Sequence, residues 1–210
     1  MKMTLTRTSD NYVVHELLRE DDPITPCEPG PTDNALAMNV ADLNVMHCSE
    51  RAGSNIRASE DGLWRAVAQG RGRMSNIVVD AGPILHRGIF IYLLISLIPA
   101  NLNPSSDPCI GYVFSETQYP QRKIVILGDT YDPTAMIPLC LNPSPSLLVH
   151  EATDSHISQH ADPSGKLSRR TPTEVEEKAR SRGHSVPEMA GEFAKKIGAK
   201  SLVLNHIGGR

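Results

Sequence analysis

The chain has 210 residues, which is enough to bury the core of one domain or to form a large fragment of a bigger domain. Its formal net charge of -3 at pH 7 and its pI of about 6.2 argue against strong, nonspecific nucleic-acid binding by the whole surface, but they leave a local basic face open. Aromatic residues make up only 4% of the chain, which argues against a base-stacking platform, and the four cysteines form no CxxC pair, which argues against a zinc knuckle or a disulfide framework.

The first half of the chain predicts short elements separated by loops. We expect a strand over residues 12–18, a loop over 26–34, a short helix over 59–67 and a strand over 77–80. The apolar run over 88–100 is too short to cross a bilayer, because a spanning helix needs roughly 20 apolar residues. The N-terminus shows no signal peptide, so the sequence predicts an intracellular, reducing location without membrane association.

The second half alternates strands with helices, which is typical of an α/β fold. A charged surface helix is expected over residues 173–182. In the next helix Ser185 is expected to be the N-cap, Glu188 completes a capping box, and Gly198 ends the helix. A polar loop is expected over residues 153–172.

Three short apolar runs in this half, over residues 124–127, 147–149 and 202–205, each precede a polar, chemically active side chain. The first leads through Gly128, interpreted as a sharp turn, to Asp129; the second leads to His150 and Glu151; the third leads to His206. Strands that end in this way are expected to present these side chains at one shared edge of the sheet, where open α/β sheets place their sites.

Five short motifs occur in order between residues 83 and 206. They are Pro83–Arg87 with Pro108–Tyr112, which read as two parts of one motif, then GDT at 128–130, HEAT at 150–153, GHS at 183–185 and LNH at 204–206. In this order and context they resemble the tRNase Z (ribonuclease Z) family of the metallo-β-lactamase fold. The resemblance covers roughly residues 76–210, with a weaker likeness over 5–75, and implies an αββα sandwich.

The resemblance also implies roles for five residues. His86 and His206 are similar to metal ligands of the family, and Asp129 is similar to the carboxylate that bridges its two zinc ions. His184 resembles the histidine that contacts the scissile phosphate and helps to protonate the leaving group, and Glu151 resembles a residue that orients it. Imidazole and carboxylate groups are suitable zinc ligands, and two metal ions suit hydrolysis of a phosphodiester.

The chain also departs from the family pattern. The metal-binding signature His-x-His-x-Asp-His is absent, and only a short turn stands where the family has a flexible tRNA-binding arm. In the family this signature supplies most ligands of both metals. The remaining residues, His86, Asp129 and His206, are therefore too few for a two-metal centre. We therefore interpret residues 1–210 as a single, partial metallo-β-lactamase-like domain, similar to the C-terminal half of the family. Deleting residues 88–106 restores the family spacing, so this segment is interpreted as an insertion or a retained intron.

The activity that the resemblance implies is zinc-dependent endonucleolytic cleavage at the 3′ side of precursor tRNA. Two alternatives stay open: a metallohydrolase or phosphodiesterase acting on small substrates, and a catalytically inactive domain that binds a partner. A homodimer is also left open. His150 is interpreted as packing within the fold, and His156 and His160 as loop residues. The basic residues between Lys166 and Arg182 are interpreted as a solvated face, with an RNA-contacting face as the alternative.

Overall fold

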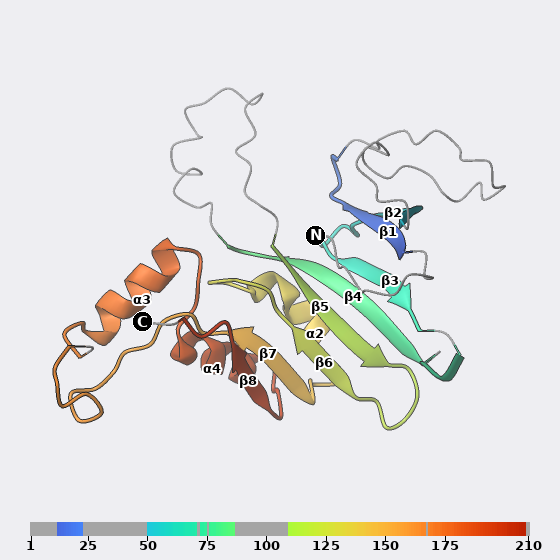
Figure 1. Cartoon of the computed structure of the whole chain (residues 1–210). Helices are drawn as coiled ribbons and strands as arrows, with labels where there is room; N and C mark the ends of the chain where they lie inside the picture. The colour runs from blue at the N-terminus through green and yellow to red at the C-terminus, as the bar shows by residue number, and fades with distance from the viewer. Residues whose placement is uncertain are drawn as a thin grey trace. The chain divides into compact units, whose positions relative to one another are not determined.

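A computed structural model describes residues 12–22, 50–70, 72–74, 76–86, 109–166 and 168–208 (Figure 1). The chain divides into two compact units, residues 1–67 and 68–210. The predicted insertion at 88–106 lies outside the described residues. The prediction of one partial domain over 1–210 stays a prediction.

In the first unit the strands β1 (Tyr12–Leu18) and β2 (Glu50–Arg57) form a two-stranded parallel sheet, and β1 has the predicted bounds. The indole N–H of Trp64 donates to the carbonyl of Leu18 at 2.7 Å. The helix predicted over 59–67 is wrong. Gly62 has a φ of +75°, which places a turn here, and strand β3 (Trp64–Gln69) follows it.

The second unit is organised on a mixed sheet with the strand order β3-β4-β5-β6-β7-β8, in which β3 crosses the division between the units. Its further strands are β4 (Ile77–Ile84), β5 (Cys109–Glu116), β6 (Lys123–Ile126), β7 (Leu147–Glu151) and β8 (Leu202–Asn205). The pairs β4–β5 and β5–β6 are antiparallel, whereas β6–β7 and β7–β8 are parallel. The three apolar runs of the second half therefore lie side by side and point the same way, as Figure 1 shows.

Short helical segments and two longer helices connect these strands. They are the 3-10 helices η2 (Gly72–Met74) and η3 (Thr134–Met136) and the α-helices α2 (Ile137–Cys140), α3 (Pro172–Ser181) and α4 (Pro187–Lys196). Both long helices were predicted, and Gly198 follows α4 with a φ of +66°.

The capping prediction placed the box on the wrong helix. The N-cap of α4 is Val186, and no side chain caps this helix. The hydroxyl of Ser185 instead donates to the carbonyl of Thr130 at 2.6 Å. The capping box lies at the start of α3, between Thr171 and Glu174. The Ser185 hydroxyl thus ties the beginning of α4 to the loop after β6.

The core of the second unit lies between the sheet and its helices. Helix α4 contacts β7 and β8, and η3 contacts β4. One buried cluster joins α3 to the start of α4 through Val175, Ala179, Val186 and Met189, with Tyr131 packed against it. The α/β class predicted from the sequence is confirmed by this layering. No helix in the described part of the chain is long and apolar enough to cross a membrane. The intracellular location stays a prediction.

Candidate metal and phosphodiester site

The candidate site lies where the three parallel strands end. Asp129 follows β6, Glu151 is the last residue of β7, and His206 follows β8. Since parallel neighbours finish at the same edge of a sheet, these side chains meet at one end of the second unit. The turn after α3 brings His184 to this edge, and the end of β4 brings His86.

Backbone pairing holds His86 beside the loop that carries Asp129. Leu85 forms an isolated bridge with Asp132, in which the Leu85 N–H donates to the Asp132 carbonyl at 3.0 Å. The hydroxyl of Thr130 donates to the carbonyl of Leu85 at 2.8 Å. Two segments that lie far apart in the sequence are thereby fixed next to each other, one residue away from each functional side chain.

The residue before Asp129 is a glycine, Gly128, because there is little room for a side chain at this position. Its φ lies outside the left-handed region, so a positive φ is not the reason for a glycine here, although the chain does bend at Asp129 after β6. A Cβ atom here would lie 3.0 Å from the sulfur of Cys109 and 3.4 Å from the carbonyl oxygen of Ile110. Burial, with a smaller contribution from Asp129, raises the pKa of the Cys109 thiol, so this cysteine stays protonated at neutral pH.

Glu151 forms the buried side of the site and accepts hydrogen bonds at both carboxylate oxygens. Its Oε1 accepts from the Thr130 backbone N–H at 2.9 Å and lies 3.0 Å from Nδ1 of His184. Its Oε2 accepts from the hydroxyl of Thr153 at 2.7 Å and from the backbone N–H of the same residue at 3.2 Å. The Glu151 side chain is 1% exposed. These bonds fix the carboxylate in a single orientation.

The position of His184 is set by the end of α3 and by Glu151. Gly183 has a φ of +85°, and the backbone N–H of His184 donates to the carbonyl of Ala179 at 2.9 Å. Because Nδ1 faces a carboxylate oxygen, which accepts, this nitrogen carries the proton of the bond. The other ring nitrogen, Nε2, is not used by this bond and is available to exchange a proton.

His206 lies at the exposed side of the site. Its Nδ1 is 2.9 Å from Oδ1 of Asp129 and 3.4 Å from the hydroxyl of Thr153. Its φ is +50°, a conformation that costs energy for a residue with a side chain. The backbone N–H of Gly208 donates to the carbonyl of Thr153 at 3.0 Å, which holds the segment after β8 against the end of β7.

The structure brings all five predicted site residues together. Ligand atoms of His86, Asp129 and His184 lie within 4.8 Å of one another, and the same is true of Glu151, His184 and His206. The ring of His184 stands between the other two imidazoles, with centroid distances of 5.0 Å to His86 and 5.2 Å to His206. Imidazole nitrogens and carboxylate oxygens at this spacing are a donor set that a divalent transition metal ion takes.

His150 has the packing position that the sequence indicated. It is fully buried, its Nδ1 lies 2.8 Å from the carbonyl oxygen of Glu151, and its ring meets that of Phe193 edge to face. Burial lowers the pKa of His150, so the ring is neutral.

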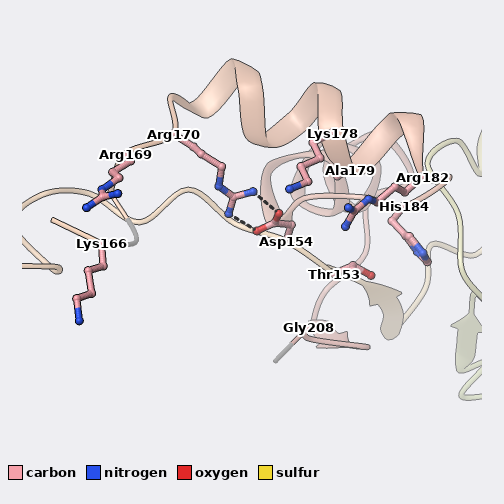
Figure 2. Close-up of a pocket in the computed structure, with 10 residues that line it drawn as sticks. All are labelled: Thr153, Asp154, Lys166, Arg169, Arg170, Lys178, Ala179, Arg182, His184 and Gly208. Atoms are coloured by element: carbon pink, nitrogen blue, oxygen red, sulfur yellow. Dashed lines mark hydrogen bonds and ion pairs between the residues drawn. The ribbon is translucent and has the colours of Figure 1, made fainter. Parts of the chain in front are cut away.

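The sequence interpretation missed the supporting residues around these side chains. Thr130 and Thr153 hold Glu151, and both belong to the GDT and HEAT motifs, so the motifs themselves carried the signal. The basic residues interpreted as a solvated face are indeed mostly exposed, but their arrangement around a pocket was not foreseen. Figure 2 shows that they surround a pocket beside His184. A list of residue types could not reveal this, because the loop and helix α3 meet only in the folded chain.

Comparison with known proteins gives related sequences but no matching family model. The chain is 35% identical over 100 residues to "Ribonuclease BN" of Proteus mirabilis and 40% identical over 91 residues to "Ribonuclease Z" of Streptococcus sanguinis. These matches cover 48% and 43% of this chain. It is 37% identical over 143 residues, 66% of its length, to "Zinc phosphodiesterase ELAC protein 1" of Bos taurus. The matches span only 27%, 23% and 31% of these relatives.

Two solved structures are also similar. The short form of human tRNase Z aligns with a TM-score of 0.49 and 28% identity, over 75% of this chain and 44% of that one. The metallo-β-lactamase fold protein YhfI of Bacillus subtilis aligns with a TM-score of 0.44 and 14% identity, over 80% of this chain and 48% of that one.

Proposed function

We propose, from the relationship of this chain to the ribonuclease Z family of the metallo-β-lactamase fold, that it binds a divalent metal ion and hydrolyses phosphodiester bonds in RNA. The observation that carries the proposal is the convergence of His86, Asp129, His184 and His206 from four distant segments onto one sheet edge. Core packing does not require three imidazoles and a carboxylate to gather in this way.

The donor set fits one ion better than two. A catalytic zinc ion takes three protein ligands and keeps a further position open. In the proposal, which follows the family resemblance, His86 and Asp129, whose ligand atoms lie within 4.8 Å of each other, hold the ion together with His206, whose Nδ1 lies 2.9 Å from Asp129 Oδ1. Zinc is the metal that suits these donors. A second ion would compete for the same side chains, because both groups of ligand atoms within 4.8 Å of one another include His184. A bound ion would supply Lewis-acid chemistry, because it polarises a phosphoryl oxygen and lowers the pKa of water.

His184 and Glu151 have a different role in this proposal. Nδ1 of His184 is bonded to the buried Glu151 carboxylate, so Nε2 is the nitrogen that can exchange a proton with a substrate. Glu151 is buried and does not reach the substrate; it positions the ring. With both ring nitrogens protonated, His184 would donate the Nε2 proton to the leaving oxygen and return to the neutral ring, and we class Glu151 as a positioning residue.

Precursor tRNA, cut at its 3′ side, is the substrate that this relationship favours. Two relatives carry the name ribonuclease, and a third is named a zinc phosphodiesterase. Since the chain spans about a quarter to a third of these relatives, both the reaction and its substrate remain proposals for this chain.

Metal binding and cleavage by the full chain test the proposal. The protein is stripped with EDTA and titrated with zinc by isothermal titration calorimetry, and cleavage of end-labelled precursor tRNA is then compared with that of bis-p-nitrophenyl phosphate. We expect His86→Ala and His206→Ala to weaken zinc binding by at least about tenfold. His160→Ala, which removes an exposed loop imidazole outside the cluster, serves as the matched control and should bind zinc normally.

The outcomes separate the candidate functions. Zinc binding together with precursor tRNA cleavage supports the proposal. Cleavage of bis-p-nitrophenyl phosphate without cleavage of tRNA would favour a hydrolase of small substrates and overturn the RNA part. Absence of zinc binding would overturn the metal site and favour an inactive binding domain.

A further inference from the structure

A basic pocket lies beside the candidate site and shares residues with it. Its volume is about 520 Å³. Its basic lining comes from the loop between β7 and α3, from α3 and from Arg182 directly after it (Figure 2). The lining residues that carry a positive charge are Lys166, Arg169, Arg170, Lys178 and Arg182.

The charge of this pocket is unusual for a chain with a net charge of -3. Among the described residues that line it, Asp154 is the one carboxylate, and it is already paired with Arg170 at 2.6 and 3.0 Å. In the described part of the chain, Lys166 and Lys178 form no ion pair with a carboxylate. The lining therefore carries more positive than negative charge.

The basic side chains are held by local structure. Lys178 and Arg182 are four residues apart, so they lie on the same side of α3, and Figure 2 shows them on the side facing Thr153 and Asp154. The loop is fastened by the Asp154–Arg170 pair. His156 adds a further contact, since its Nδ1 lies 3.0 Å from the carbonyl of Arg170.

Hydrogen bonds within the same loop surround the buried carboxylate of Asp162. Asp162 is 6% exposed, and it accepts from the hydroxyl of Ser164 at 2.6 Å and from the backbone N–H of Ser168 at 2.9 Å. The guanidinium Nε of Arg169 donates to the carbonyl of Gly165 at 3.2 Å. The cations are thus presented by an ordered loop, which reduces the conformational entropy that a bound anion would have to remove.

The pocket is continuous with the candidate site through Thr153 and His184. Both residues line the pocket, and both bond to Glu151. We propose that this pocket binds the backbone phosphates of an RNA strand adjacent to the bond that is cut. This inference rests on the proposed function and adds to it the residues that hold the strand.

The lining favours a strand over a mononucleotide. Apart from the imidazole of His184, the described lining residues include no aromatic side chain on which a base could stack. Lysine and arginine side chains spread along a loop and a helix match a series of phosphates better than a single anion. Recognition here is therefore of the backbone, without base specificity.

Binding of a short RNA in the absence of cleavage tests this inference. A 12-nucleotide, fluorescein-labelled single-stranded RNA is titrated with the full chain in EDTA, and its anisotropy is followed at several salt concentrations. We expect Lys178→Gln and Arg169→Gln each to raise the dissociation constant about three- to tenfold at low salt. Each should also reduce the slope of log K against log salt by about 0.7.

The matched control is Lys195→Gln. Lys195 is an exposed lysine in the last turn of α4, as Lys178 is in the last turn of α3, but it does not line the pocket. It should leave the dissociation constant within about twofold and the salt slope unchanged. Equal effects of the Lys178 and Lys195 substitutions would overturn the inference, because RNA would then respond only to overall charge.

A competitor and the choice of buffer separate the possible results. Tripolyphosphate is added as a competitor: if it binds the pocket while the RNA does not, the strand is the wrong ligand and the inference fails. Because the RNA titration is carried out in EDTA, it measures binding without a metal ion and without cleavage. Loss of metal binding or of cleavage therefore counts against the proposed function alone, whereas an unchanged salt slope in Lys178→Gln counts against the pocket alone.

Discussion

Replacing Glu151 with glutamine removes the negative charge on the buried side of the candidate site while keeping the size of the side chain. In the native chain the two carboxylate oxygens face donors only: the Thr130 N–H and His184 Nδ1–H at one oxygen, and the Thr153 N–H and hydroxyl at the other. An amide offers one acceptor and one donor, so one side of the group must change its bonding.

The structure indicates which side changes. At the Oε2 position the Thr153 hydroxyl can rotate to accept from the new amide, and the Thr153 N–H also donates to the carbonyl of Ser185 at 3.1 Å. The amide oxygen is therefore expected at the Oε1 position. The bonds from Thr130 and His184 then become neutral, and each loses about 1 kcal/mol. We expect Glu151→Gln to lower the free energy of unfolding by about 2 kcal/mol.

Urea unfolding followed by circular dichroism measures this change. Glu177→Gln, an exposed substitution of the same chemistry on α3, is the control and should stay within about 0.5 kcal/mol of wild type. Long-range ¹H–¹⁵N spectra of His184 should show the Nδ1–H tautomer in both wild type and Glu151→Gln. If Glu151→Gln were as stable as the control, or if the His184 proton were on Nε2 in the wild type, the assigned hydrogen bonds would be incorrect.

The same substitution should affect the proposed reaction less than removal of His184 does. We expect Glu151→Gln to lower kcat/KM for RNA cleavage about 10- to 100-fold, since it alters the orientation and basicity of a ring that stays in place. His184→Ala should lower it further, by about 100- to 10,000-fold. Measuring the pH dependence of kcat/KM tests the positioning role, because a merely structural role of Glu151 would leave the shape of the profile unchanged.

Two further substitutions probe the surroundings of the site. Gly128→Ala would place a methyl group 3.0 Å from the sulfur of Cys109 and should destabilise the chain by about 1–3 kcal/mol in thermal unfolding, with partial rescue by Cys109→Ala; an unaffected single variant would show that this contact is not tight. Lys123→Met removes the two hydrogen bonds that the buried Lys123 ammonium donates to the carbonyls of Leu139 and Leu141 at 2.8 Å, and should cost about 2 kcal/mol in urea. Burial lowers the pKa of Lys123, so the wild type should gain stability relative to Lys123→Met as the pH rises from the folded-state pKa toward 10.5; a constant difference between pH 8 and pH 10.5 would contradict this.

Local patterns in the sequence were sufficient to predict an element where its structure depends mainly on the residues of that segment. The apolar runs at 124–127, 147–149 and 202–205 form strands because each is short and apolar. Burial on both faces does not hold for β6 and β8, because Ile124, Ile126 and Val203 are exposed. The helix that ends before Gly198 follows from the spacing of its apolar face. The ordered motifs likewise indicated five side chains that the fold brings together.

Predictions from local sequence patterns were wrong where a residue far away in the sequence determines the local structure. The Ser185 hydroxyl fits an N-cap, but it is within reach of the Thr130 carbonyl, which takes its hydrogen bond. Gly128 resembles a turn glycine, although its requirement comes from Cys109, a residue on the neighbouring strand β5. The segment 59–67 has helical composition, but the turn at Gly62 leads into a strand.

The sequence by itself determined which atoms are available for chemistry: the imidazoles, the carboxylates and the strand ends that carry them. Only the tertiary structure decided that Glu151 is enclosed by donors and that His184 presents one particular nitrogen. It also decided that the charges of a loop and a helix add up in one pocket. The physical reason is that hydrogen bonds and electrostatic potentials depend on distances between residues far apart in the chain, and only the packed sheet and helices fix those distances.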